Sequence, residues 1–213
     1  MKAEISVIFP HADNAWNNEL YELNKQMLKE NTRCKYELLT LWNNDRDYVY
    51  PAWNALAKLC KADVFVWSNT DVLFAPDWDV NVLKYINQTD YCGIWLVECG
   101  SIGVHENNID RNFGRTAKTF RRAEFEDWVK VEGEKFPETI EKFSWYSPSA
   151  FKKDWFLKRG GFPTDEPFPA PNDARFVDKM KEDKCKFLTV KSFAYHLQYA
   201  RENTGEKEFS ETR

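Results

Sequence analysis

Short apolar runs alternate with segments of helical periodicity along the first seventy residues. The runs at residues 5–9, 36–42 and 62–68 have the length and composition of buried strands, and Pro10 is expected to stop the first. Between them, apolar residues recur at the spacing of amphipathic helices: Trp16, Leu20, Leu23 and Met27 in one segment, and Val49, Trp53, Leu56 and Cys60 in the next. The pattern predicts two βαβ steps and hence a parallel sheet with right-handed crossovers.

The second half of the chain continues the pattern less regularly. We expect a helix at 77–86 and a strand at 91–98, and then a long polar insertion at 99–142 that crosses the top of the sheet. The remaining expected elements are a helix at 151–158 ending at Gly160-Gly161, a helix at 172–183, and strands at 187–190 and 192–195. Together they predict one α/β domain over residues 1–213, a three-layer sandwich whose mostly parallel mixed sheet is flanked by helices. The charged tail also fits a piece of a longer polypeptide.

Composition narrows the class of protein. The chain has 213 residues, 43% of them hydrophobic, which is enough for a sizeable core. Its 30 basic and 34 acidic residues give no basic excess, so nucleic acid is not an expected partner. Five scattered cysteines form no CxxC pair and are expected to be reduced thiols. No apolar run approaches the ~20 residues of a membrane span, so we expect a soluble cytoplasmic protein.

Polar residues follow each of the three early strands. They are His11, Asp13 and Asn14 after the first, Asn43, Asn44 and Asp45 after the second, and Asn69, Thr70 and Asp71 after the third. Ligands of open parallel sheets bind at the carboxyl ends of the strands, so we expect these groups to meet at one edge. Amide and carboxylate oxygens gathered there suit a ligand with base, ribose and phosphate parts.

Asn69-Thr70-Asp71 is the most informative of these groups. A carboxylate in the loop after a buried strand can bind Mg²⁺ or Mn²⁺, and such an ion can neutralise a diphosphate leaving group. The alternative is that Asn69 and Asp71 only form a turn. Asp77-Trp78-Asp79 is also an Asp-x-Asp sequence, but its place at a predicted helix start favours acids that complement the helix dipole.

Two features of the insertion have competing interpretations. His105 has no paired ligand nearby and is expected to be a surface residue. The basic stretch that contains Arg115, Lys118, Arg121 and Arg122 is either a solvated face or a flexible lid over a diphosphate.

Taken in order along the chain, these pieces resemble the GT-A glycosyltransferases, most closely the large family that contains many bacterial and viral sugar transferases. The matching pieces are residues 5–10, 36–45 and 64–71, Asn54 with Ala57, Pro76-Asp77-Trp78, residues 149–153 leading to Gly160-Gly161-Phe162, Asn172-Asp173, and His196. The resemblance covers nearly the whole chain except residues 99–142. It implies the Rossmann-like GT-A fold and a UDP-sugar donor held by Mn²⁺ or Mg²⁺.

The resemblance also implies roles for individual residues. Asp71 and His196 would bind the metal, or His196 the diphosphate, and Asp173 would be the general base beside the acceptor hydroxyl of an inverting enzyme. The nucleotide-sugar contacts would come from Pro10, His11, Asn14, Asn43, Asn44, Asn54, Ser68, Asn69 and Thr70. The chain departs from the family at Asn43, Asn69 and Asn172, which replace acidic residues. An amide oxygen still accepts or coordinates but brings no charge, so we expect modest metal affinity.

The expected function is transfer of a hexose from a UDP-sugar to a carbohydrate hydroxyl. A sugar-phosphate nucleotidyltransferase is one alternative, but it would have a Gly-rich loop with Arg and Lys after the first strand, where this chain has no glycine. A non-catalytic carbohydrate-binding module is the other alternative, favoured by the 16% aromatic content. Such modules are commonly all-β, and the alternating helices argue against one.

Overall fold

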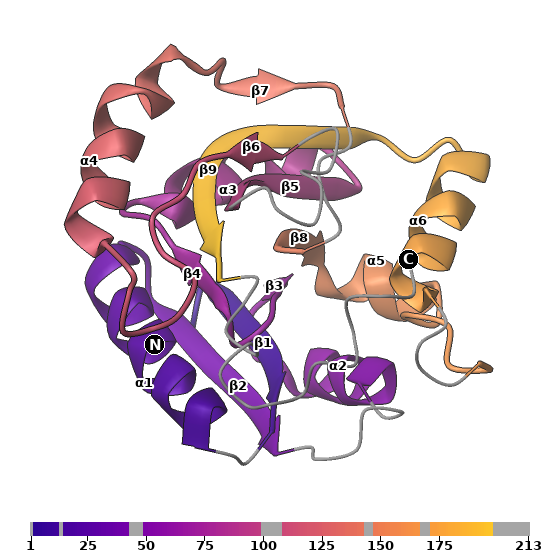
Figure 1. Cartoon of the computed structure of the whole chain (residues 1–213). Helices are drawn as coiled ribbons and strands as arrows, with labels where there is room; N and C mark the ends of the chain where they lie inside the picture. Colours follow the sequence, from indigo (N-terminus) through magenta and orange to yellow (C-terminus); the bar gives the residue numbers. More distant parts are fainter. Residues whose placement is uncertain are drawn as a thin grey trace.

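One mixed sheet runs through the centre of the molecule, with helices packed on both of its faces (Figure 1). The computed structural model describes residues 2–12, 15–42, 49–98, 108–142, 147–166 and 171–197. The strands in these ranges are β1 (Ile5–His11), β2 (Tyr36–Trp42), β3 (Val64–Trp67), β4 (Val72–Phe74), β5 (Tyr91–Glu98), β6 (Ile109–Asp110), β7 (Thr139–Ile140), β8 (Ser149–Lys152) and β9 (Phe187–His196). Their helices are α1 (Ala15–Asn31), α2 (Val49–Leu59), α3 (Trp78–Tyr85), α4 (Arg122–Val131), α5 (Lys153–Lys158) and α6 (Asn172–Glu182), with short 3-10 helices η2 (Ile86–Gln88) and η3 (Gly133–Lys135).

The order of the strands identifies the architecture. Among the described residues, the sheet runs β2-β1-β3-β8-β5-β9-β4, with β6 beside β5 and β7 beside β9. The two longest pairings, β1 with β2 and β5 with β9, are parallel, whereas β8 and β4 run antiparallel to their neighbours. The predicted α/β sandwich with a mostly parallel mixed sheet is therefore confirmed.

The first half of the chain follows the sequence prediction closely. α1 and α2 connect three parallel neighbours, β1, β2 and β3. β1 nevertheless continues through Pro10 to His11, where the sequence predicts a stop. β3 pairs with β1 only at Ser6, Val7 and Ile8, so the missing N–H of Pro10 removes no hydrogen bond to β3. The longer β1 carries His11 to the same level as the end of β2.

Two buried strands, β4 and β8, are not predicted from the sequence. β4 has three residues and β8 has four, too few to show a period of two. β8 lies antiparallel between β3 and β5, and α5 therefore begins at Lys153 and not near residue 151. β9 is one strand where two were predicted, with a shift of register against β5 between Ile94 and Trp95.

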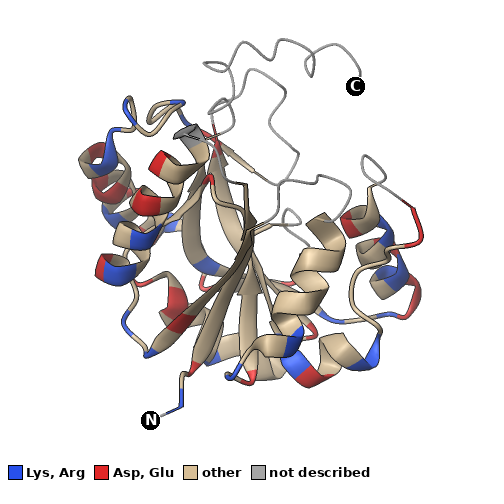
Figure 2. Ribbon diagram, turned by 90° about the horizontal axis from the view of Figure 1, so that it is seen from below, with Lys and Arg blue, Asp and Glu red and all other residues tan. Residues whose placement is uncertain are grey.

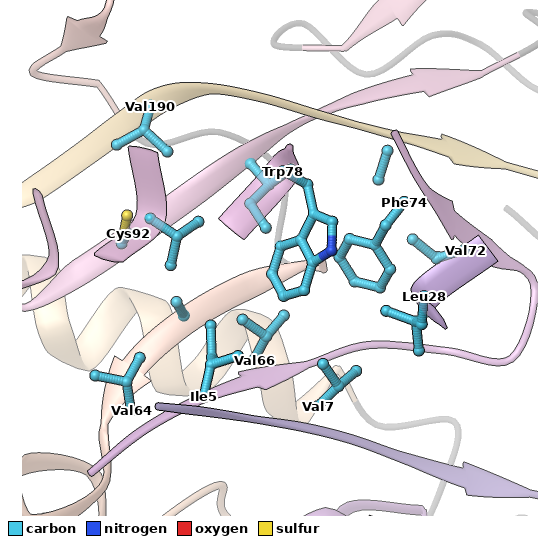
Figure 3. Close-up of a cluster of buried hydrophobic side chains, with 14 of the residues drawn as sticks. Ile5, Val7, Leu28, Val64, Val66, Val72, Phe74, Trp78, Cys92 and Val190 are labelled. Atoms are coloured by element: carbon cyan, nitrogen blue, oxygen red, sulfur yellow. The ribbon is translucent and has the colours of Figure 1, made fainter. Parts of the chain in front are cut away.

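Alternate residues of β3 pack into two apolar clusters, which lie on opposite faces of the sheet. In β3, Val66 belongs to the cluster under α1 and α3, and Trp67 to the cluster under α2, α5 and α6. Phe74 and Trp78 pack against each other in the first cluster, with tilted rings whose centroids are 4.4 Å apart (Figure 3). Each large apolar side chain buried in this way contributes roughly 1.5–3 kcal/mol, so the two clusters fix the sheet on which the strand-end loops are mounted.

The described part of the predicted insertion, residues 108–142, packs beside the sheet and does not cross its top. β6 pairs with β5 and β7 with β9, while Phe113 and Phe125 join Tyr195 in a third apolar cluster. Arg122 pairs with Glu30 of α1 at 2.6 Å and with Glu126 at 2.7 Å. The pair with Glu30 joins α4 to α1, so Arg122 serves the fold and not a flexible lid. His105 lies outside the described residues.

Charged residues lie mainly on the helices and loops that surround the sheet. Figure 2 shows acidic and basic residues intermingled on the helices, whereas most of each strand is uncharged. None of the described helices is both long and apolar enough to cross a membrane. The cysteines within the described ranges, Cys34, Cys60, Cys92 and Cys185, are free thiols.

The Asp-x-Asp sequence at residues 77–79 holds two parts of the fold together. The carboxylate of Asp79, a residue 1% exposed, accepts the backbone N–H groups of Arg33 at 3.2 Å and Cys34 at 2.7 Å. Asp77 forms a surface ion pair with the Arg33 guanidinium, Nη2 lying 2.6 Å from Oδ2. The two carboxylates thus join the start of α3 to the segment between α1 and β2.

We expect Asp79→Ala to lower the free energy of unfolding by about 1–3 kcal/mol, because buried N–H groups lose their acceptor. Urea unfolding followed by far-UV circular dichroism measures the change. Asp77→Ala is the matched control and should cost no more than about 1 kcal/mol, since it removes only an exposed ion pair. Equal losses in the two variants would contradict this assignment.

Candidate functional site

The loops that follow β1 and β3 lie against each other at the carboxyl edge of the sheet. The backbone N–H of Ser68 donates to the carbonyl of Ile8 at 3.0 Å, which extends the pairing of β3 with β1. Two residues further along both segments, the Thr70 hydroxyl donates to the carbonyl of Pro10 at 3.2 Å. Ser68 and Thr70 are both buried, so their side chains belong to the packing of this edge.

The loop that carries Asp71 is held in place by a buried amide. Asn24 of α1 donates from Nδ2 to the carbonyls of Asn69, Thr70 and Val72, at 3.4, 3.1 and 2.7 Å. The carbonyl of Asn69 also accepts the N–H of Val72 at 3.2 Å, which closes a tight turn. The turn interpretation is therefore right for the backbone, and it leaves the Asp71 side chain available for contacts outside the loop.

Asp71, His196 and Glu98 form a row at the ends of three neighbouring strands. The Nε2 atom of His196 lies 3.5 Å from Oδ2 of Asp71, and its Nδ1 atom lies 3.3 Å from Oε2 of Glu98. Asp71 and His196 keep about a fifth of their side-chain surface exposed, whereas Glu98 is 1% exposed. Asp71 and His196 were predicted as metal ligands, but Glu98 was not predicted.

The charge of this row is dominated by its two carboxylates. Burial lowers the pKa of His196, but the nearby carboxylates of Asp71 and Glu98 outweigh that effect and raise it to about 9. The imidazole is therefore protonated near neutral pH and supplies a positive charge between the two acids. A site of this kind demands a cation, which is either the imidazolium itself or a bound metal ion.

Two side chains of the row present metal donors toward each other. The Asp71 carboxylate and the Nε2 atom of His196 face one another across a gap of 3.5 Å. Within the described ranges, no group of three or more His, Cys, Asp or Glu side chains is arranged to hold an ion. An ion at this place would therefore take further ligands from a substrate or from water.

An aromatic cluster lies at the ends of β1 and β2. The His11 ring contacts Tyr21 and Trp42, with centroids 4.6 and 4.5 Å away, and its Nε2 atom lies 2.9 Å from Oδ1 of Asn18. His11 is 1% exposed, and its Nδ1 atom has no hydrogen-bond partner in the described part of the chain. Trp42 is 59% exposed and offers an open aromatic face at the end of β2. The sequence interpretation named His11 but missed Trp42.

Asp173 lies in the first turn of α6 and is joined to the start of α2. Its Oδ1 atom accepts the Tyr50 hydroxyl at 3.0 Å and the N–H of Ala174 at 2.9 Å. Burial, and next the charge of Asp173, raise the pKa of Tyr50 above its usual range. Tyr50 packs against Trp53, whose indole N–H donates to the Ser68 carbonyl at 3.1 Å. These contacts connect Asp173 to the edge that carries Asp71.

The other residues predicted from the resemblance fall into two groups. The Asn54 amide donates to and accepts from the backbone of Phe162, at 2.8 and 2.9 Å, so its hydrogen-bonding groups already hold the Gly161-Phe162 turn. The fully buried Asn172 likewise bonds the Glu166 carbonyl at 2.9 Å. Asn14, Asn43 and Asn44 lie outside the described residues.

A cavity of about 380 Å³ opens elsewhere, between the loop at residues 160–165 and α6. Arg159, Phe162 and Lys179 are among the residues that line it, and none of the predicted site residues does. We place the candidate site at the strand ends and not in this cavity, because the titratable and donor groups converge at the strand ends.

Comparison with known proteins supports the fold. No family model matches the chain, and no curated protein sequence matches it. Among solved structures, the chain is similar to GalNAc-T7 in a structure with UDP, GalNAc and Mn²⁺, with a TM-score of 0.54 and 10% sequence identity. The match covers 92% of this chain and 44% of GalNAc-T7, so the chain spans less than half of that protein's length. The similarity shows that the chain shares the GT-A-like fold of that protein.

Proposed function

We propose that the chain is a glycosyltransferase that transfers a hexose from a UDP-sugar to a hydroxyl group of a carbohydrate. The observation that carries the proposal is the row of Asp71, His196 and Glu98 at the carboxyl edge of a GT-A-like sheet. In this reaction the acceptor oxygen bonds to C1 of the sugar while the bond from C1 to the diphosphate oxygen breaks. UDP leaves with the electron pair, and the hydroxyl proton passes to a base.

The residues present fit a divalent metal ion. Carboxylate and imidazole groups are both donors for Mn²⁺, and Mg²⁺ favours oxygen donors such as Asp71. An ion bound to a diphosphate needs only one or two protein side chains, because phosphate oxygens and water supply its other ligands. When bound, the ion would neutralise charge that develops on the departing diphosphate. Asp71 and His196 are the residues proposed to hold it.

Removing Asp71 should abolish metal-dependent nucleotide binding. We expect Asp71→Ala to lose Mn²⁺-dependent UDP binding in isothermal titration calorimetry. The same substitution should reduce the rate at which the enzyme hydrolyses a UDP-sugar by roughly a hundredfold or more. Asp77→Ala is the matched control, since its carboxylate pairs only with surface Arg33 in the described structure. If the control loses metal dependence and Asp71→Ala keeps it, the metal binds at residues 77–79 and not at Asp71.

The nucleobase is proposed to stack on Trp42. Trp42 is 59% exposed, and its ring meets the buried His11 ring edge-on, with centroids 4.5 Å apart. This contact fixes one side of the indole ring and leaves its other side open to a ligand. The further nucleotide-sugar contacts are proposed for Pro10, His11, Asn14, Asn43, Asn44, Ser68, Asn69 and Thr70. Asn54 has the least support, because its amide is paired with Phe162.

Stacking of a base on an aromatic side chain contributes roughly 1–3 kcal/mol, so Trp42→Ala should weaken UDP binding at saturating Mn²⁺ by about 5- to 150-fold. Trp42→Phe should retain most of the affinity. Leu59→Ala removes another exposed apolar residue, 65% exposed, and should bind like the wild type. Unchanged affinity in Trp42→Ala would remove this residue from the nucleotide site.

Asp173 is proposed as the general base of an inverting reaction. Its Oδ1 atom already accepts two hydrogen bonds, from Tyr50 and Ala174, which hold the carboxylate in one orientation. Asp173→Asn should lower kcat by about 10²–10⁴ with little change in donor affinity, because it removes the proton acceptor. Asp178→Asn, which changes an exposed acid of the same helix, is the control.

The product separates the base role from a purely structural one. If Asp173 only complements the dipole of α6, Asp173→Asn should cost only ~0.3–1 kcal/mol of stability and leave turnover nearly unchanged. NMR of the product gives the anomeric configuration, and retention would contradict the base role even if activity fell. Asp173 would then be assigned to binding a hydroxyl of the donor or acceptor.

A further inference from the structure

Glu98 is a buried carboxylate to which neither the sequence pattern nor the proposed reaction gives a role. It ends β5 and is 1% exposed. A carboxylate taken out of water is costly unless charged or polar groups compensate it. The groups that surround Glu98 therefore indicate why it is there.

Two side chains hold the Glu98 carboxylate in a fixed orientation. Asn108 donates from Nδ2 to Oε1 at 2.6 Å, and Nδ1 of His196 lies 3.3 Å from Oε2. Glu98 and His196 are partners in the register of β5 and β9, so the contact is set by the sheet. Asn108 thus fixes the position of Oε1 of Glu98, and Oε2 faces the imidazole of His196.

The two nitrogens of the His196 ring face different carboxylates. Nε2 points at Asp71 across 3.5 Å, and Nδ1 points at Glu98 across 3.3 Å. Because the two nitrogens point away from each other, an ion that binds Nε2 beside Asp71 is out of reach of Glu98. This agrees with the finding that no three acidic or imidazole groups converge in the described part of the chain.

We infer that Glu98 is the positioning residue of His196. It accepts the Nδ1 proton, which leaves the lone pair of Nε2 directed at the ion proposed beside Asp71 and fixes the plane of the ring. Metal-binding histidines commonly donate their second N–H to a carboxylate, and removal of that partner typically costs about 10–100-fold in metal affinity. The inference rests on the proposed metal-dependent function, since it assigns Glu98 to the same site.

The test is a double-mutant cycle on Mn²⁺ affinity, measured by electron paramagnetic resonance of free Mn²⁺ in the presence of UDP. Glu98→Ala should weaken Mn²⁺ binding by about 10–100-fold. In a His196→Ala background the same change should cost nothing further, because Glu98 acts through the ring. Glu98→Gln retains an acceptor for the Nδ1 proton and should lose less than Glu98→Ala, and it keeps the test valid if the alanine variant fails to fold.

Glu138→Gln changes an exposed carboxylate bonded to Lys84 and is the matched control, expected to bind Mn²⁺ as the wild type does. Losses that add in the double variant would make Glu98 a direct ligand and overturn the inference. Wild-type affinity in both Glu98 variants, with only a lower melting temperature, would assign Glu98 to stability alone. If the wild type binds no Mn²⁺ with UDP, both this inference and the proposed function fail; if it binds and the Glu98 variants bind equally well, only this inference fails.

Discussion

The position of β9 between β4 and β5 determines the metal site proposed for this protein. His196 pairs in register with Val72 on one side and with Glu98 on the other, and the N–H of Leu197 donates to the Asp71 carbonyl at 2.9 Å. A slip of β9 by one residue would turn the imidazole to the opposite face of the sheet. The candidate site therefore depends on a register that the first and third apolar clusters hold in place, through Ala194 on one side and Tyr195 on the other.

That register has an electrostatic consequence. It brings the carboxylates of Asp71 and Glu98 to the two nitrogens of one ring, and their combined charge raises the pKa of His196 to about 9. Without a bound metal ion, the protonated His196 ring supplies the positive charge between the two carboxylates. In the proposed reaction a divalent ion would replace the proton at Nε2, on the side of the ring that faces Asp71, while Glu98 continues to hold Nδ1.

Several elements could be predicted from sequence because they are long and strongly periodic. β2 and α2 begin at the residues that the apolar pattern indicates, and β5 matches its predicted range. β4 and β8 could not be predicted, because three or four fully buried residues show no periodicity. The order of the central strands was also out of reach, since pairing between distant segments leaves no local signal.

Part of the candidate site could be predicted for a similar reason. Asp71 and His196 stand at the ends of recognisable strands, where ligands of α/β sheets bind. Glu98 also ends a predicted strand, but a single acid there is given a role only by its partner His196 on β9. The role of Asn24 could not be predicted either, because its three hydrogen bonds to the backbone around Asp71 depend on how α1 packs.

The most direct measurement of the central claim is X-ray diffraction from crystals grown with UDP and Mn²⁺, recorded near the manganese absorption edge. The account predicts one anomalous peak that lies between the Asp71 carboxylate and Nε2 of His196 and also contacts the diphosphate of UDP. A peak elsewhere, or UDP bound at the strand ends with no manganese peak beside Asp71, would contradict it.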